Sequence, residues 1–94
     1  MLTQNDYFDG KVKSIGFVAS EGRATVGVME PGDYEFGTST HEIMKVISGS
    51  LTVVLPGTTA ETVFHPGETF EVAGGQSFKV KTTEASSYLC LYGE

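Results

Sequence analysis

Few side chains in this sequence could bind a metal or take part in acid–base chemistry, and their spacing limits what they can do. The chain has two histidines, His41 and His65. His41 directly precedes Glu42, so strand alternation sends these two side chains to opposite faces. His65 precedes the turn residues Pro66 and Gly67, which predicts a surface position. A zinc, iron or manganese site needs at least three converging ligands, so we predict no metal and no cofactor.

The single cysteine is better suited to packing than to catalysis. Cys90 lies inside the apolar run SSYLCLY (86–92), where burial raises the pKa of a thiol and disfavours nucleophilic attack. One cysteine cannot form an internal disulfide, which favours a reducing compartment. The opening MLTQNDYFDG lacks the basic start and apolar stretch of a signal peptide. These features predict a cytoplasmic protein.

Length and charge argue against several classes of partner. Ninety-four residues are expected to form one domain, residues 1–94, with a single modest core. The formal net charge is −6 and the six Lys and Arg are scattered, which argues against nucleic acid as a partner. No apolar run approaches the roughly 20 residues of a membrane span. We therefore expect neither a nucleic-acid nor a membrane partner.

The elements that must position any site are predicted to be short strands. Turn residues punctuate the chain at regular intervals, and the segments between them are rich in Val, Thr, Phe and Tyr without a helical period. Such a pattern is typical of a sandwich or closed barrel, so we predict an all-β fold. The predicted strands cover residues 11–17, 24–30, 33–38, 42–48, 51–55, 61–65, 69–72, 77–82 and 86–92.

The strand EIMKVIS (42–48) is partly apolar on both of its faces. Alternation places Glu42 with Met44 and Val46 on one face and Ile43 with Ile47 on the other. One face is expected to meet a second sheet, and the other a partner subunit. Because two-fold symmetry is the commonest oligomeric arrangement, we predict a homodimer.

The distance from Glu42 to Gly49, the hairpin that follows and the later segment PGETFEVAGG (66–75) resemble the cupin family. Cupins are double-stranded β-helices, jelly-roll-like barrels in which two motifs flank one cavity. The resemblance implies that Glu42 lies in that cavity. It also implies a single cupin domain.

Metal-binding cupins carry two histidines a few positions before this glutamate and a third histidine in the second motif. The first two positions hold Glu35 and Gly37 here, or Phe36 and Thr38 with a different loop length. The third position holds Phe78. The resemblance therefore implies a cupin without the metal ligands of its metal-binding relatives.

A more specific resemblance covers the chain from residue 5 to residue 92. The segments that carry it are NDYFDGKVKSIGF (5–17), GRATVGVMEPGDYEFGT (22–38), EIMKVISGSLTVVLPG (42–57) and SSYLCLY (86–92). They are similar to the small cupin-type pyrimidine/purine nucleoside phosphorylases. The resemblance implies that a purine or pyrimidine nucleoside and inorganic phosphate, the co-substrate, give a free base and ribose 1-phosphate.

The loop AGGQSF (73–78) departs from this family's pattern. Relatives carry a proline where Ala73 stands, and the two glycines that follow make the loop conformationally freer. If the loop borders the cavity, we expect it to change substrate preference or activity.

Phosphorolysis passes through a ribosyl cation, so it needs an anion site beside C1′ and groups that fix the ribose hydroxyls. Arg23 is the candidate for phosphate, because its planar fork matches phosphate oxygens and it follows Gly22. Glu42 is the candidate for the ribose hydroxyls and for stabilising the cation. The competing interpretations are a solvated charge for Arg23 and a structural ion pair between the two residues.

Seven further residues are candidates for substrate binding. Tyr34 and Tyr88, with Phe36 and Phe78, could stack on a base of any kind, although core packing is the competing interpretation. Glu35 could share the role of Glu42 or be a solvated strand carboxylate. Gln76 could contact a base edge, and Ser77 with Gly74, Gly75 and Gln76 could form an anion nest or only a turn.

Two other functions compete with the phosphorylase hypothesis. The first alternative is a non-catalytic cupin module that binds a small sugar or nucleoside. The second is a metal-dependent cupin isomerase or dioxygenase, which the missing histidines disfavour. Dependence on phosphate separates the phosphorylase from the binding module, and metal analysis separates both from the third possibility.

Overall fold

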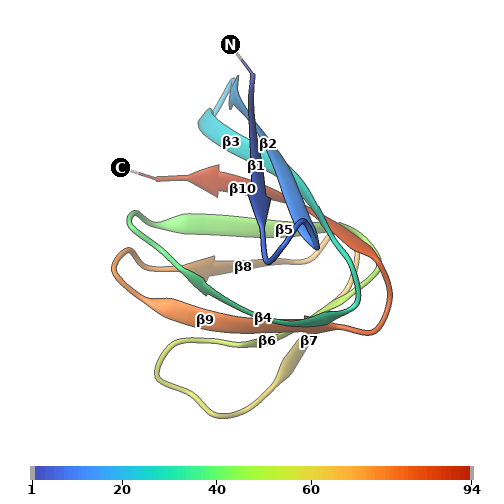
Figure 1. Cartoon of the computed structure of the whole chain (residues 1–94). Coiled ribbons are helices and arrows are strands. Elements are labelled where there is room, and N and C mark those ends of the chain that lie inside the picture. Colours follow the sequence, from blue (N-terminus) through green and yellow to red (C-terminus); the bar gives the residue numbers. More distant parts are fainter. Residues whose placement is uncertain (1, 94) are drawn as a thin grey trace.

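The structure, a computed structural model, describes residues 2–93 as strands joined by turns and loops. The predicted domain limits, residues 1 and 94, lie outside these described residues. The strands form two sheets, which lie one above the other in Figure 1. All pairings within both sheets are antiparallel. This arrangement confirms the predicted all-β, jelly-roll-like fold.

The larger sheet has six strands. In spatial order they are β1 (Thr3–Tyr7), β2 (Val12–Ala19), β3 (Gly22–Met29), β10 (Ser86–Tyr92), β5 (Glu42–Ser48) and β8 (Thr69–Val72). The smaller sheet has four strands, in the order β4 (Gly32–Gly37), β9 (Ser77–Thr82), β6 (Leu51–Val54) and β7 (Thr62–Phe64). The last strand, β10, pairs with β3 and β5 in the middle of the larger sheet.

Nine of the strands match predicted segments. Four of the nine have the predicted bounds, and the other five differ by one or two residues at one or both ends. The strand β1 was not predicted, because TQNDY has no apolar alternation and all but one of its residues are exposed. It pairs with β2 over its whole length, from Thr3 opposite Gly16 to Tyr7 opposite Val12. Its position is therefore set by backbone pairing with β2 and not by burial of its own side chains.

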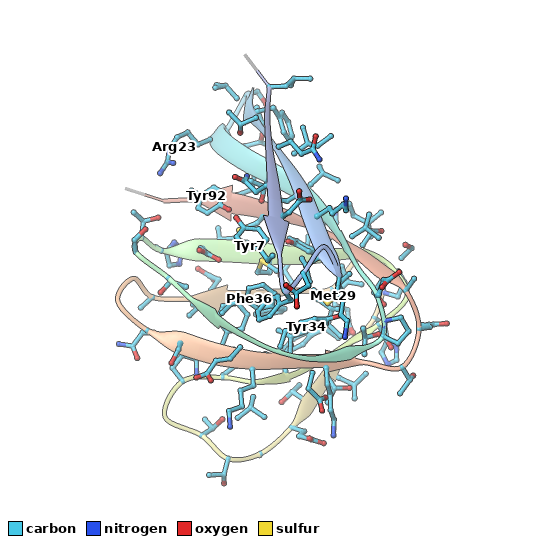
Figure 2. The ribbon with its side chains drawn as sticks, in the orientation of Figure 1. Tyr7, Arg23, Met29, Tyr34, Phe36 and Tyr92 are labelled. Carbon is cyan, nitrogen blue, oxygen red and sulfur yellow. The ribbon has the colours of Figure 1, made fainter. Side chains whose placement is uncertain are left out.

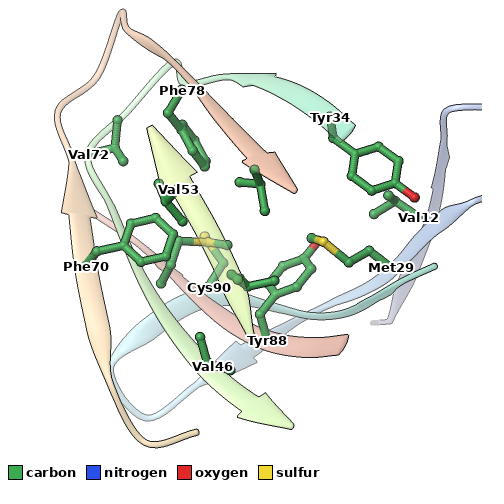
Figure 3. Close-up of a cluster of buried hydrophobic side chains, with 13 residues drawn as sticks. Val12, Met29, Tyr34, Val46, Val53, Phe70, Val72, Phe78, Tyr88 and Cys90 are labelled. Atoms are coloured by element: carbon green, nitrogen blue, oxygen red, sulfur yellow. The ribbon is translucent and has the colours of Figure 1, made fainter. Parts of the chain in front are cut away.

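The core fills the space between the two sheets, as Figure 3 shows. Alternation decides which residues enter it: in SFKVKT of β9, Phe78, Val80 and Thr82 are buried and the two lysines are exposed, as predicted. In β5 the buried residues are Met44 and Val46, which lie on the same face as Glu42. The face of β5 that carries the glutamate is thus the concave one.

The opposite, convex face of the larger sheet carries exposed apolar side chains. Ile15, Val26, Val28 and Ile47 are each between about two-fifths and half exposed. Leu89 of β10 joins them, because its Cα pairs with that of Val26. This convex apolar face is the surface that the sequence predicts for a partner subunit. In the part of the chain that the structure describes, no helix has the length and apolar character that spanning a membrane requires.

Candidate active site

A cavity of about 360 Å³ opens on the concave face of the larger sheet, between β3, β5 and β10 on one side and β4 and β9 on the other. Its polar lining consists of two carboxylates, one thiol and a set of hydroxyls. One carboxylate is that of Glu42; the other is that of Glu35, which lies at the exposed rim because its neighbours Tyr34 and Phe36 take the inward face of β4. No lysine or arginine among residues 2–93 lines it. The cavity therefore offers negative charge and neutral hydrogen-bonding groups, a combination that favours a positively charged reaction centre.

Glu42 is the first residue of β5, and its side chain in the cavity is contacted by Cys90 of the neighbouring strand β10. The Cα of Glu42 pairs with that of Tyr92 on one side and Val72 on the other. The thiol of Cys90 donates a hydrogen bond to Oε1 of Glu42 over 3.5 Å. Burial raises the pKa of Glu42 above its ordinary value, and the bond from Cys90 opposes that shift. Glu42 is thus a half-buried carboxyl whose charge is sensitive to its surroundings.

Cys90 contributes to the site as a neutral donor. The side chain is buried, as the sequence predicts, and it borders the cavity. Burial, together with the nearby charge of Glu42, raises its pKa to about 12. A thiol in this state stays protonated near neutral pH, so it orients the carboxylate and is unsuited to nucleophilic attack.

Tyr92 lies between the two residues that the sequence analysis selects for catalysis. Its ring stacks beneath the guanidinium of Arg23, whose Cζ is 5.3 Å from the ring centroid. Its Cα pairs with that of Glu42 on the neighbouring strand. Arg23, Tyr92 and Glu42 thus form one row across β3, β10 and β5. Figure 2 shows Arg23 and Tyr92 side by side at the upper left of the molecule.

The Tyr92 hydroxyl and the Thr25 hydroxyl form a hydrogen bond of 3.2 Å at this end of the cavity. Burial raises the pKa of Tyr92 to about 12, so its hydroxyl remains a donor. Thr25 and Tyr92 line the cavity and also line a second hollow, which contains Arg23 and Asn5. The two residues therefore separate a carboxylate-containing cavity from a hollow that contains a cation.

No ion pair joins Glu42 to Arg23 among the residues that the structure describes. The strands β3 and β5 flank β10, so the backbones that carry the two residues are about 10 Å apart. A structural salt bridge, one of the alternatives weighed for these residues, is not formed in this conformation. Arg23 has its charge satisfied by the face of Tyr92 and by solvent.

The other end of the cavity is aromatic. Phe36 and Phe78 stack with their ring centroids 5.7 Å apart and an interplanar angle of 28°. Phe8 meets the edge of Phe36 at 5.5 Å. All three rings line the cavity. Because aromatic faces bind any flat ring, this end suits a nucleobase of either class.

Tyr88 enters the cavity from the centre of β10 and depends on a glycine for its position. Its Cα pairs with that of Gly27 on β3. A Cβ on Gly27 would clash with both Cζ and the hydroxyl oxygen of Tyr88. Burial raises the pKa of Tyr88 well above its ordinary value, so the phenol is neutral. Gly27 thus provides the space in which the phenol ring lies.

The structure brings together only some of the predicted substrate-binding residues. Tyr88 and Glu42 lie in the cavity, and Glu35 is at its rim, exposed. Tyr34 packs beside Phe8 but does not line the cavity, and its hydroxyl donates to the carbonyl of Glu30 over 2.6 Å. That bond leaves the Tyr34 hydroxyl committed to the fold.

Gln76 and Ser77 lie away from the cavity, in the AGGQSF loop and at the start of β9. The backbone N–H groups of Gly75 and Gln76, considered above as an anion nest, donate to the carbonyl and the hydroxyl of Thr38. The Thr38 hydroxyl in turn donates to the carbonyl of Ala73 over 2.7 Å. The loop is therefore fastened to Thr38, and none of residues 73–76 lines the cavity.

The positions that correspond to metal ligands in metal-binding cupins carry other chemistry here. Phe36 and Phe78 stack inside the cavity. His41 faces away from Glu42, as predicted, and its Nε2 lies 2.9 Å from Oε1 of Glu71. His65 is exposed in its turn, also as predicted. Within residues 2–93, no three His, Cys, Asp or Glu side chains converge in a way that could hold a metal ion.

Sequence reasoning did not select Tyr92, Thr25 or Phe8. The first two gain their importance from the register of β10 against β3 and β5, which a single sequence does not reveal. Phe8 follows the unpredicted strand β1. The one available signal was the shared parity of Tyr92, Cys90 and Tyr88 within SSYLCLY, which places them on one face.

The chain is similar over almost its whole length to one family of proteins. The profile of the family described as "Pyrimidine/purine nucleoside phosphorylase" matches residues 2–92. A pyrimidine/purine nucleoside phosphorylase from Marinobacter nauticus is 58% identical over 93 residues, which are 99% of this chain and 100% of that protein. A pyrimidine/purine nucleoside phosphorylase from Shewanella halifaxensis is 56% identical with the same coverage.

Solved structures agree with the fold. A protein of unknown function from Vibrio parahaemolyticus superposes with a TM-score of 0.92 at 42% identity, covering 96% of each chain. The cupin domain of Drosophila melanogaster CENP-C superposes with a TM-score of 0.72 at 15% identity, covering 98% of this chain and 75% of that one. The second likeness concerns the fold alone, and it supports the cupin architecture. The match along almost the whole length shows that the chain belongs to the pyrimidine/purine nucleoside phosphorylase family.

Proposed function

We propose that this protein catalyses the phosphorolysis of purine and pyrimidine nucleosides to a free base and ribose 1-phosphate. The observation that carries the proposal is the row formed by Arg23, Tyr92 and Glu42 at one end of a cavity whose other end is aromatic. Family membership supports the same reaction, because the full-length relatives bear that name. Inorganic phosphate is the co-substrate.

The reaction replaces one bond at C1′ of the ribose with another. The C1′–N bond breaks and its electron pair leaves with the base, which then takes up a proton. An oxygen of inorganic phosphate forms the new bond to C1′. Between these events the ribose resembles an oxocarbenium ion, so a nearby carboxylate lowers the barrier by electrostatic attraction. The step needs no protein nucleophile, because positioning and fixed charges can supply much of the acceleration.

Glu42 is proposed to bind the ribose. Its ionised carboxylate accepts hydrogen bonds from the vicinal 2′ and 3′ hydroxyls and favours positive charge at C1′. The hydrogen bond from Cys90 supports this role, because it orients Oε1 of Glu42 without neutralising it. Tyr92 and Thr25 offer further hydroxyls at the same end. Glu35, at the exposed rim, is the second carboxylate available to a bound nucleoside.

Arg23 is proposed to bind phosphate in the hollow that adjoins the cavity. Arg23 lies on the far side of Tyr92 from Glu42, which supports a site where the dianion and the carboxylate do not repel each other at close range. The guanidinium fork binds two phosphate oxygens at once. With phosphate beside Arg23 and the nucleoside in the cavity, C1′ lies near Thr25 and Tyr92, the residues shared by the two spaces.

The test uses chelator-treated protein with uridine or adenosine, in the presence and absence of phosphate, and follows the free base by chromatography. The proposal predicts release of both bases only when phosphate is present. If no base is released but either nucleoside raises the melting temperature, the protein is a binding module. If release appears only after a metal is restored, the reaction depends on a metal and the proposed chemistry is wrong.

We also propose that the protein acts as a homodimer joined through the convex apolar face of the larger sheet. Ile15, Val26, Val28 and Ile47 expose apolar area there that water disfavours. A second copy is the best-matched occupant, because the rim of this face carries both signs of charge. Lys13 and Asp6 lie at the β1–β2 side, where they are 3.5 Å apart, and Lys45 lies at the β5–β8 side with Glu71, which contacts His41. A two-fold arrangement can oppose unlike charges across the interface.

Cytoplasmic activity is part of the same proposal. Its support is the free thiol of Cys90, which is buried and has no cysteine partner in this sequence. Fractionation of cells that produce the protein, with activity measured in each fraction, tests this location.

A further inference from the structure

The turn between β1 and β2 has an unusual backbone. Phe8 and Asp9 have φ values of 54° and 58°, and Gly10 follows with φ 84°. Residues with a Cβ rarely adopt this left-handed conformation, and for a bulky residue such as Phe8 it is an outlier. The conformation is held by backbone hydrogen bonds from Gly10 to Tyr7 and from Lys11 to Phe8. A tight β-hairpin turn requires positive φ at its central residues, which are usually Asn, Asp or Gly, so it is the bulky phenylalanine at this position that is unusual.

The consequence of this turn is the position of the Phe8 ring. Phe8 lines the cavity and is 41% exposed. It packs against Tyr34, with centroids 4.9 Å apart, and meets Phe36 nearly edge-on at an interplanar angle of 84°. In Figure 2 the turn after Tyr7 comes down beside Tyr34 and Phe36. Phe8 is thus fixed by two aromatic neighbours and keeps part of its ring open to solvent at the cavity.

We propose that Phe8 is the residue against which the nucleobase packs, and that this contact is made alike by purines and pyrimidines. This inference rests on the proposed function, because the ribose end of the cavity is assigned through Glu42. With the ribose at Glu42, the base extends toward the aromatic end formed by Phe8, Phe36 and Phe78. These rings offer apolar surface and no hydrogen-bonding group, so they distinguish purines from pyrimidines poorly.

Substitution of Phe8 by leucine tests this role, because it keeps the apolar volume and removes the aromatic face. We expect the KM for uridine and for adenosine to rise about tenfold, as expected for the loss of one base–aromatic stack. The KM for phosphate is expected to stay unchanged, and the melting temperature is expected to fall by about 4–8 °C because the ring contacts with Tyr34 and Phe36 are lost. The Phe8→Tyr variant restores an aromatic face and is expected to recover the KM of the original protein. An unchanged nucleoside KM in Phe8→Leu would overturn the proposal.

Fluorescence gives a second readout that is independent of turnover. The chain contains no tryptophan, so Phe8→Trp introduces a single reporter. Saturable quenching of this tryptophan by adenosine and by uridine, but not by ribose 1-phosphate, is the expected result. The matched control is Phe64→Trp: Phe64 packs on Phe70 at 4.7 Å and does not line the cavity, so its signal should not respond. Equal responses of both reporters would contradict a specific contact at Phe8.

These measurements separate the inference from the function on which it rests. If the unsubstituted protein releases base with phosphate but Phe8→Trp is silent, the contact is wrong and the phosphorylase assignment stands. If Phe8→Trp is quenched by nucleosides but the unsubstituted protein releases no base, the contact stands and the phosphorylase assignment fails.

Discussion

The thiol of Cys90 donates a hydrogen bond to Oε1 of Glu42, and the two atoms are 3.5 Å apart. Burial raises the pKa of the Glu42 carboxyl above its ordinary value. The Cys90 thiol has a pKa of about 12 and therefore stays protonated, so it can donate to that carboxyl. The carboxylate can then have one oxygen oriented by the protein while the other remains available to a ligand.

Substitution of Glu42 by glutamine is expected to lower kcat/KM for uridine by about 10- to 100-fold, as expected when a charge-assisted hydrogen bond is lost. A substrate without the 2′ hydroxyl makes one fewer contact with residue 42. The loss should therefore be smaller for 2′-deoxyuridine than for uridine. Steady-state kinetics with both substrates checks this, and an equal loss for the two would show that Glu42 does not bind the 2′ hydroxyl.

The raised pKa of Glu42 predicts how stability depends on pH. The folded state holds the proton of Glu42 more tightly than the unfolded state does. The contribution of Glu42 to stability therefore falls as the pH rises from 4.5, the ordinary pKa of a glutamate, through the higher pKa of Glu42 in the folded protein. Glu42→Gln removes this effect, so the variant is expected to melt at a higher temperature than the parent at pH 7. That difference should disappear well below pH 4.5. Melting curves over this pH range provide the measurement, and a variant less stable at pH 7 contradicts the prediction.

Arg23 is expected to act on phosphate and not on the nucleoside. Replacement by alanine should raise the KM for phosphate by about tenfold or more, with little change in the KM for uridine, because a charged bidentate contact is lost. Replacement by lysine keeps the charge but not the fork and should be intermediate. Lys79, exposed on β9 outside the cavity, is the matched control, and Lys79→Ala should leave both constants unchanged. A selective rise in the uridine KM would contradict the assignment.

The convex apolar face is expected to mediate dimerisation. Val26→Glu adds a charge at the centre of this face and should convert the dimer to a monomer in analytical ultracentrifugation. Val63 is about as exposed as Val26 but lies on β7 of the other sheet, so Val63→Glu is the control and should leave the dimer intact. A parent protein that sediments as a monomer, or a Val26→Glu variant that remains dimeric, would contradict the interface.

Much of this architecture follows from local patterns. Strand alternation placed Glu42 on one face with Met44 and Val46 and sent His41 away from it, and the resemblance to cupins identified that face as the one that lines the cavity. The turn residues Pro66 and Gly67 predicted that His65 is exposed, as the structure shows. These predictions succeeded because each depends on a few neighbouring residues and on the period of two in a strand.

Features that depend on pairing between distant strands were not predictable in the same way. Tyr92 has its role because β10 lies between β3 and β5, which brings Arg23 and Glu42 to either side of it. Tyr34 has the expected aromatic character, but a contact to Glu30 occupies its hydroxyl. The backbone of the AGGQSF loop has the expected freedom, but Thr38 binds its N–H groups. Each outcome reflects a hydrogen bond or register that composition does not specify.

The most direct test of the account follows inorganic phosphate by ³¹P NMR while uridine or adenosine is consumed. The expected result is a ribose 1-phosphate signal that grows in equal molar amount to the free base, with both products strongly reduced in Glu42→Gln and in Arg23→Ala. Base released without ribose 1-phosphate would mean hydrolysis, and full activity in both variants would mean that the reaction takes place elsewhere on the molecule. Either of these results would contradict the central claim.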